Sequence, residues 1–233
     1  MTTFVLVHGA WHGSWAWDRV VPVLEDAGAR TVNVTLPWEG APGLHDHVAE
    51  VVSALDGLTA ADDVVLVGHS YAGLVVREAA DQRSTLVRQL ILVDGWAASD
   101  GAGLFDLAPA PFVDAVRRSA EANADNRYIP APAAGAFGIT DPGDVDWLSQ
   151  RLVPQPLRTF TEATRLTGAV DQIPGTAIYC RPQVYQFEQF AKEIGYRTVP
   201  IDGPHNVMLT HPHELTALLL DVHPATTGDR SIG

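Results

Sequence analysis

Short apolar runs alternate with helix-length amphipathic segments along most of this chain, and few folds accommodate that alternation. The runs are almost continuously Val, Ile and Leu, without the polar residues that alternate along a strand with one solvated face. Strands covered by helices on both faces have this composition. We therefore predict an α/β fold with a mostly parallel, doubly wound sheet. The predicted strands span residues 3–7, 31–35, 64–67, 90–93, 177–180 and 197–201.

The segments between the strands have apolar residues at helical spacing, which predicts helices on both faces of the sheet. Gly28 and Gly195 follow two of these segments, and glycine at that place stops a helix because it adopts the left-handed conformation without a Cβ penalty. The predicted helices span residues 18–26, 45–56, 74–81, 185–194 and 213–222.

Residues 97–168 depart from this rhythm and are rich in Ala, Pro and Asp. A structureless loop of that length is unusual inside a compact domain, so we predict an inserted helical lid, with helices near residues 112–122 and 145–152. The core would then comprise residues 1–96 and 169–223. The polar residues 224–233 are expected to form a flexible tail.

Charge and cysteine content exclude several functions. The 233 residues include 15 Lys+Arg and 28 Asp+Glu, a net charge of −13, and the basic residues are scattered. Such a chain repels nucleic acid and anionic membranes, so neither is an expected partner. The single cysteine, Cys180, cannot form an intramolecular disulfide, and no leader or membrane span is evident. We expect a cytoplasmic protein.

A serine stands in a sharp turn between a predicted strand and a predicted helix, in the sequence VVLVGHSYAGL of residues 64–74. This is the arrangement of a nucleophile elbow, which needs small residues around the turn and holds the serine hydroxyl at the N-terminus of the helix. Ala72 replaces the second glycine of the G-x-S-x-G pattern and is still small. The pattern predicts Ser70 as a nucleophile, although a serine in an ordinary tight turn would look similar.

The first predicted strand leads into HGAWHGSWAW at residues 8–17. Together with the serine motif, this segment resembles the α/β-hydrolase superfamily, in particular the small plant and bacterial esterases of the methylketone synthase, methylesterase and hydroxynitrile lyase group. The resemblance implies an α/β-hydrolase fold and an oxyanion hole made by the backbone N–H groups of Ala10 and Tyr71. Two fixed amide donors would stabilise the charge of a tetrahedral intermediate. His8 is expected to be structural.

The catalytic histidine of this fold follows the last strand, where GPHNVM occupies residues 203–208. We therefore predict His205 as the general base for Ser70. The other histidines include two close pairs, His45 with His47 and His211 with His213, but neither has the spacing and third ligand of a zinc site. No metal or cofactor is predicted.

The third member of the triad is not where the resemblance implies it. These esterases have an aspartate in the loop after the strand at residues 177–180, and here Gln183 occupies that position. Asp94, at the end of the strand at residues 90–93, is our alternative acid, because the acid acts through geometry and charge rather than through its place in the sequence. Otherwise Asp94 would cap the turn into the lid, and Gln183 or a carbonyl would hold His205.

Three tryptophans follow strand ends, where α/β sheets bind their ligands. Trp11, Trp38 and Trp96 are predicted to line an apolar or aromatic-tolerant pocket for a small-molecule substrate; packing of the helices onto the sheet is the alternative.

We therefore predict a carboxylic ester hydrolase that cleaves a small ester, thioester or lactone through an acyl-enzyme. A cyclase or other tailoring enzyme of specialised metabolism, a lyase and a ligand-binding pseudoenzyme are the alternatives. The hydroxynitrile lyases have threonine where this chain has Gly9 and lysine where it has Asn206, which disfavours the lyase. The sequence does not decide between a monomer and a homodimer.

Overall fold

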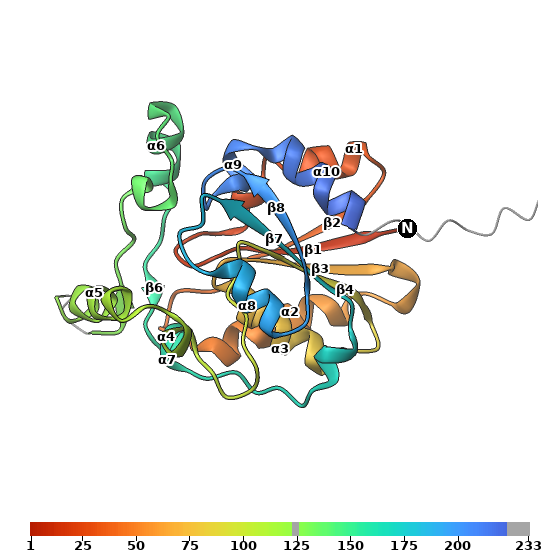
Figure 1. Cartoon of the computed structure of the whole chain (residues 1–233), viewed down its shortest axis with the longest axis horizontal. Helices are drawn as coiled ribbons and strands as arrows, with labels where there is room; N and C mark the ends of the chain where they lie inside the picture. Colours follow the sequence, from red (N-terminus) through yellow and green to blue (C-terminus); the bar gives the residue numbers. More distant parts are fainter. Residues whose placement is uncertain (123–125, 223–233) are drawn as a thin grey trace, which may run out of the picture.

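A six-stranded sheet, in which every strand is parallel to its neighbours, forms the centre of the computed structural model, which describes residues 1–122 and 126–222 (Figure 1). The strand order β2-β1-β3-β4-β7-β8 is that of a doubly wound sheet, so the predicted α/β fold class is confirmed. The strands are β1 (Thr3–Val7), β2 (Arg30–Val34), β3 (Val64–His69), β4 (Val87–Val93), β7 (Gly175–Arg181) and β8 (Arg197–Asp202).

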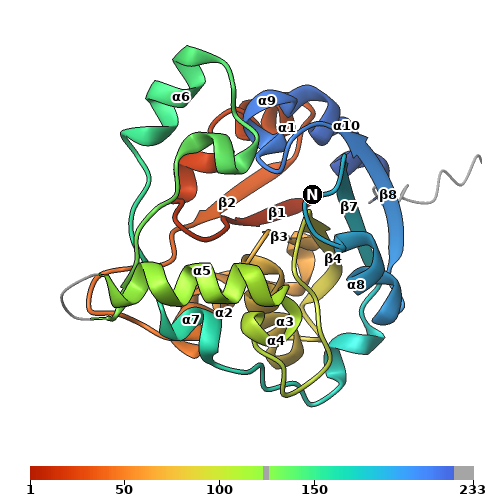
Figure 2. The ribbon, with the colours of Figure 1, turned by 60° about the vertical axis from the view of Figure 1, so that its left-hand side comes forward.

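Helices cover both faces of the sheet (Figures 1 and 2). One apolar cluster joins the sheet to α2 (Leu44–Asp56), α3 (Ala72–Gln82) and α8 (Phe187–Glu193). A second cluster joins the other face to α1 (Val21–Asp26), α9 (Val207–Thr210) and α10 (Pro212–Val222). The central strands β1 and β3 are buried along their whole length, which explains their continuous apolar sequence.

The first predicted helix was placed too early in the chain. A 3-10 helix, η1 (Ser14–Trp17), precedes α1, and α1 begins only at Val21. Pro22 lies in the first turn of α1, the place that a proline favours because it has no N–H to donate within the helix. The short helices η2 (Ala60–Asp62) and η4 (Ala169–Gln172) complete the core.

Residues 97–168, called the insertion below, project from one side of the sheet (Figure 1). Two of its helices correspond to the helices predicted there, α5 (Ala110–Glu121) and α6 (Pro142–Ser149). Its other elements are α4 (Leu104–Leu107), η3 (Ala134–Phe137), α7 (Arg158–Thr161) and an antiparallel pair formed by β5 (Tyr128–Ile129) and β6 (Gln155–Pro156).

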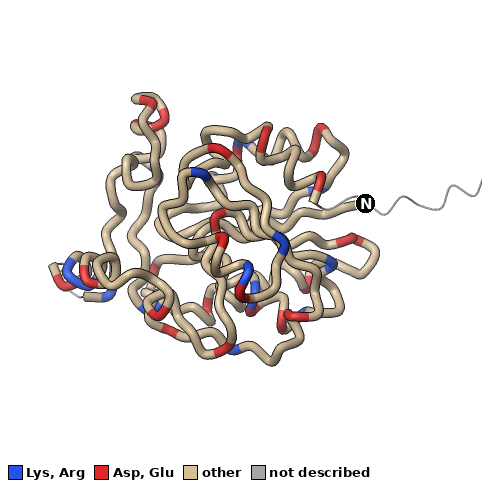
Figure 3. The backbone as a smooth tube through the Cα atoms, viewed as in Figure 1, with Lys and Arg blue, Asp and Glu red and all other residues tan. Residues whose placement is uncertain are grey.

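Charged residues are dispersed over the structure, as Figure 3 shows. Within the two described ranges, no helix is both long enough and apolar enough to cross a membrane. The predicted flexible tail, residues 224–233, lies outside the described residues.

Candidate active site

Ser70 stands between β3 and α3 in a backbone conformation that only a few non-glycine residues adopt, with φ of 53°. Its N–H donates to the carbonyl of Val93 (3.1 Å), and its own carbonyl accepts from the N–H of Trp96 (3.0 Å). A Cβ on Gly73 would lie 2.2 Å from the Trp96 carbonyl oxygen, so only glycine lets α3 pack this closely against the loop that follows β4. The predicted elbow is therefore held against the end of β4.

The three residues predicted as a triad are brought together by the fold. The Ser70 hydroxyl lies 2.9 Å from Nε2 of His205, and Nδ1 of His205 lies 2.6 Å from Oδ2 of Asp94. Because the Asp94 carboxylate can only accept, Nδ1 carries the proton, and Nε2 is left to accept from Ser70. Asp94 is buried, and its other oxygen accepts from the N–H of Cys180 (2.9 Å). The carboxylate is thus fixed by β7 on one side and oriented toward His205 on the other.

Gln183 does not contact this arrangement. It lies exposed in the loop after β7, where its side-chain oxygen accepts from the N–H of Glu188 (3.2 Å). The alternative in which Gln183 holds His205 is therefore wrong. The topology explains why, because β4 lies between β3 and β7 in the sheet, and a residue at its end reaches His205 directly.

The loop after β1 brings Ala10 beside the nucleophile. A Cβ on Gly9 would lie 2.9 Å from the Cβ of Ser70 and 2.8 Å from Nδ1 of His69, so the loop needs glycine at this point. Ala10 and Tyr71 line one cavity together with Ser70. Among the described residues, no protein acceptor takes the N–H of either residue, which leaves both amides available to a ligand.

Several histidines around Ser70 are buried and neutral. Burial lowers the pKa of His8 to about 3 and those of His12 and His47 to about 4, and it lowers the pKa of His69 well below its usual range. Each contributes hydrogen bonds to the loops of the site. His69 donates through Nε2 to the His205 carbonyl (3.0 Å), and Nε2 of His8 accepts from the N–H of Leu36 (3.0 Å).

A cavity of about 420 Å³ opens above Ser70 and His205. Trp11 and Trp96 line it, as predicted, but Trp38 does not: its side chain is 36% exposed and packs edge-on against Tyr128. No described lining residue is Asp, Glu, Lys or Arg. Other aromatic and aliphatic side chains of the lining are Leu104, Phe112, Val116, Ile129, Phe137, Phe160, Val184 and Tyr185.

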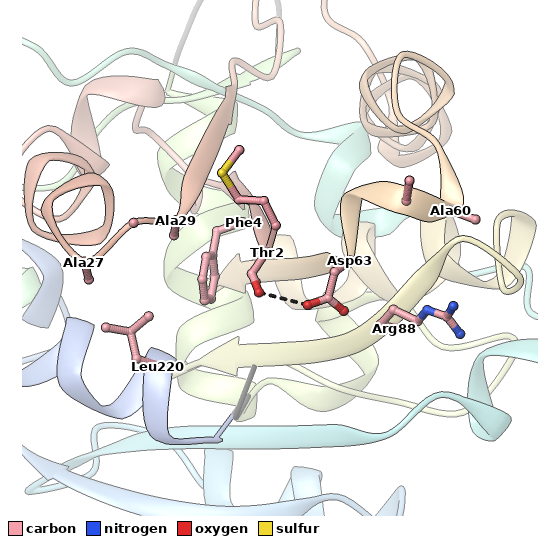
Figure 4. A pocket seen from close by; sticks show the side chains of 11 residues that line it. Thr2, Phe4, Ala27, Ala29, Ala60, Asp63, Arg88 and Leu220 are labelled. Atoms are coloured by element: carbon pink, nitrogen blue, oxygen red, sulfur yellow. Dashed lines mark hydrogen bonds between the residues drawn. The ribbon is translucent and has the colours of Figure 1, made fainter. Parts of the chain in front are cut away.

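A larger cavity, of about 900 Å³, lies at the other end of the sheet (Figure 4). Its lining includes Thr2, which donates to Asp63 (2.8 Å), and Arg88 near the start of β4. This is the edge where the strands begin. Because parallel sheets bind their ligands where strands end, the smaller cavity at Ser70 is the candidate active site.

Two buried polar residues that were not predicted as site residues also lie at the site. Gln155 in β6 is buried and accepts from the N–H of Trp11 (3.0 Å). Asn206 is buried beside His205, and its side-chain nitrogen donates to Nε2 of His12 (2.9 Å). Only Asn206 adjoins a recognisable motif, and Gln155 stands between two prolines in a segment without periodicity.

Comparison with known proteins agrees with this architecture. A carbendazim hydrolyzing esterase from Nocardioides sp. (strain SG-4G) is 30% identical over 94% of this chain and 98% of its own length. An alpha-hydroxynitrile lyase from Arabidopsis thaliana is 31% identical over 40% of this chain and 39% of its own. The structure of an extracellular alpha/beta-hydrolase from a Paenibacillus species, 20% identical, superposes with a TM-score of 0.86 over 96% of this chain and 100% of that one.

The family model described as alpha/beta hydrolase family matches residues 4–218, which include all of the central sheet except the first residue of β1. The chain therefore belongs to the alpha/beta hydrolase family, and its relatives support a carboxylic ester hydrolase.

Proposed function

We propose that this chain is a serine hydrolase that cleaves small, uncharged carboxylic esters through an acyl-enzyme on Ser70. The observation that carries the proposal is the chain of two hydrogen bonds from Ser70 through His205 to Asp94, at the base of an uncharged cavity. Thioesters and lactones present the same electrophilic carbonyl and belong to the same proposal.

The geometry supports a two-step reaction. The Ser70 oxygen attacks the carbonyl carbon while Nε2 of His205 accepts its proton, and Asp94 stabilises the imidazolium that forms. The backbone N–H groups of Ala10 and Tyr71 would stabilise the oxyanion. His205 then gives the proton to the departing alcohol as the ester C–O bond breaks, and a water molecule repeats the sequence to release the acid and restore Ser70.

The cavity supports an uncharged substrate. A charged group would lose its hydration there without meeting an opposite charge, which is unfavourable. Aromatic walls such as Phe160, Trp96 and Tyr185 suit a planar or branched acyl or alcohol group. Much of the lining, including Phe112, comes from the insertion, so we also propose that the insertion acts as a lid over the substrate.

The first experiment is labelling with a fluorophosphonate probe, followed by intact mass measurement. Such a probe reacts with an activated serine and does not require the natural substrate. One adduct per chain is expected, and the matched variant Ser70→Ala should form none. Absence of an adduct on folded wild-type protein would refute the acyl-enzyme mechanism.

A panel of matched esters then tests the substrate class. Phenyl acetate and phenyl butyrate carry no charge, whereas monophenyl succinate places a carboxylate near the ester. We expect kcat/KM at least about 100-fold lower for the charged ester, because about 2.7 kcal/mol of unpaired desolvation has that effect. Equal rates for phenyl acetate and monophenyl succinate would contradict this substrate class.

Two of the alternatives, the pseudoenzyme and the lyase, are less well supported. A pseudoenzyme would be favoured by a triad without an acid, but Asp94 forms a hydrogen bond with His205. A lyase resembling the hydroxynitrile group would carry threonine at Gly9, where even a Cβ approaches Ser70 to 2.9 Å. It would also carry lysine at Asn206, which here is fully buried.

A further inference from the structure

Trp11 joins the loop of the oxyanion hole to the insertion through all of its polar groups. Its N–H donates to Oε1 of Gln155 (3.0 Å), and its carbonyl accepts from the N–H of Val153 (2.9 Å). Its indole N–H donates to the carbonyl of Ile129 (3.1 Å). Trp11 also has a φ of 64°, a conformation that a tryptophan rarely adopts unless its surroundings impose it.

Gln155 is itself fixed in orientation. It is buried, with 5% of its surface exposed, and its Nε2 donates to the hydroxyl of Thr159 (2.7 Å). The Thr159 hydroxyl donates in turn to the carbonyl of Pro156 (2.6 Å), so it can only accept from Gln155. Reversing the Gln155 amide would place a donor against the Trp11 N–H. The amide oxygen therefore points to Trp11.

The other end of the same peptide group is held from the core. The carbonyl of Ala10 accepts from Nδ1 of His12 (2.6 Å). Burial lowers the pKa of His12 to about 4, so the ring is neutral and its Nε2 accepts from Asn206 (2.9 Å). The peptide that joins Ala10 to Trp11 is thus bonded at its carbonyl by the core and at its N–H by the insertion.

We propose that Gln155 is a positioning residue for the oxyanion hole, acting through the Ala10–Trp11 peptide. Fixing that peptide plane restrains ψ of Ala10, and so limits how far the neighbouring peptide, which carries the Ala10 N–H, can turn relative to Ser70. Without Gln155 the Trp11 N–H loses its acceptor, and the peptide is restrained only by the bond from His12 to the Ala10 carbonyl. The inference rests on the proposed hydrolase function and assigns part of the oxyanion hole's geometry to the insertion.

The test compares Gln155→Met, which keeps the length of the side chain but has no amide, with Gln150→Met. Gln150 is an exposed glutamine in the same insertion and serves as the matched control. The readouts are the rate of fluorophosphonate labelling, kcat and KM for phenyl acetate, the pH profile of kcat/KM, and the affinity of an arylboronic acid, which forms a tetrahedral anion on an active serine. Circular dichroism and thermal unfolding verify the fold.

We expect Gln155→Met to lower kcat and the labelling rate by about 10- to 100-fold, the range for a displaced oxyanion donor. KM and the pH profile should stay near wild-type values, because Ser70, His205 and Asp94 are untouched. Boronic acid affinity should fall by a factor similar to that for kcat, which a general change in cavity shape would not produce. Gln150→Met should leave every readout unchanged.

A second pair keeps the proposal testable if Gln155→Met does not fold. Thr159→Val removes the hydroxyl that orients Gln155, whereas Thr159→Ser retains it. We expect a loss of kcat in Thr159→Val and near-complete recovery in Thr159→Ser. Wild-type kcat and labelling rate in folded Gln155→Met or in Thr159→Val would overturn the positioning role. An unlabelled wild-type protein would instead refute the serine mechanism, and the inference with it.

Discussion

Acidification from pH 7 to pH 5 should destabilise the folded protein steeply, because four imidazoles are buried in their neutral form. The pKa of His8 is lowered to about 3, those of His12 and His47 to about 4, and that of His69 well below its usual range, in each case chiefly by burial. An unfolded chain protonates its histidines near pH 6.5. Between about pH 4 and 6.5 the unfolded state therefore binds more protons than the native state, and stability is lost as the pH falls.

The magnitude is large for a protein of this size. Each imidazole contributes about 1.4 kcal/mol per pH unit below 6.5, so at pH 5 His8, His12 and His47 together remove about 6 kcal/mol of the free energy of unfolding, and His69 acts in the same direction. Because whole domains are stable by only about 5–15 kcal/mol, this loss is a large fraction of the total stability at pH 5.

Urea unfolding at a series of pH values between about 5 and 7.5 measures this slope. The variant His47→Gln provides the control, because glutamine can donate to the Pro37 carbonyl and accept from the Tyr71 hydroxyl as His47 does (2.7 and 3.0 Å). The variant should reduce the pH dependence of the unfolding free energy by the equivalent of about one bound proton. A wild-type slope of less than one proton between about pH 5 and 6 would refute the neutral, buried state of these histidines.

Further predictions concern the reaction centre. Asp94→Asn should lower kcat by about 10⁴-fold, since asparagine cannot stabilise the imidazolium, whereas Gln183→Ala should retain wild-type kcat; steady-state kinetics of both variants decide between the two positions. Gly9→Ala should lose fluorophosphonate labelling, because its Cβ would lie 2.9 Å from the Cβ of Ser70 and push the loop outward. Full labelling of folded Gly9→Ala would contradict this, because it would show that the loop after β1 can move away from Ser70 without loss of serine reactivity.

The centre of the sheet was predictable because β1 and β3 are apolar on both faces, and the strand bounds were least predictable where polar residues interrupt that pattern. β4 begins at Val87, three residues before its predicted start. The prediction missed these residues because Arg88 and Gln89 interrupt the apolar run. Gln89 is buried nonetheless, and its amide donates to the Val222 carbonyl (2.8 Å). The two-residue strands of the insertion are too short for any periodicity to mark them.

The site was predictable to the extent that its residues lie in local motifs. Ser70 and His205 stand in short motifs that follow strands, but the contact between His205 and Asp94 depends on which strands are neighbours, and no local pattern encodes that order. Trp38 is a residue that its place in the sequence wrongly assigned to the cavity at Ser70. It follows β2 in the sequence, yet the Pro37 carbonyl is bound by His47 of α2, and the indole lies outside the substrate cavity.

The position of the Asp94 carboxylate directly after β4 has a consequence for engineering. The resemblance in the sequence implies an acid in the loop after β7, where it would tie the length and composition of that loop to the orientation of the histidine. In this chain Asp94 contacts His205 instead, so the loop after β7 does not have to supply an acid. Val184 and Tyr185 of this loop still line the cavity at Ser70. Mutant libraries confined to residues 183–186 should therefore redirect selectivity while leaving the reaction machinery intact, which makes this loop the first place to evolve new substrates.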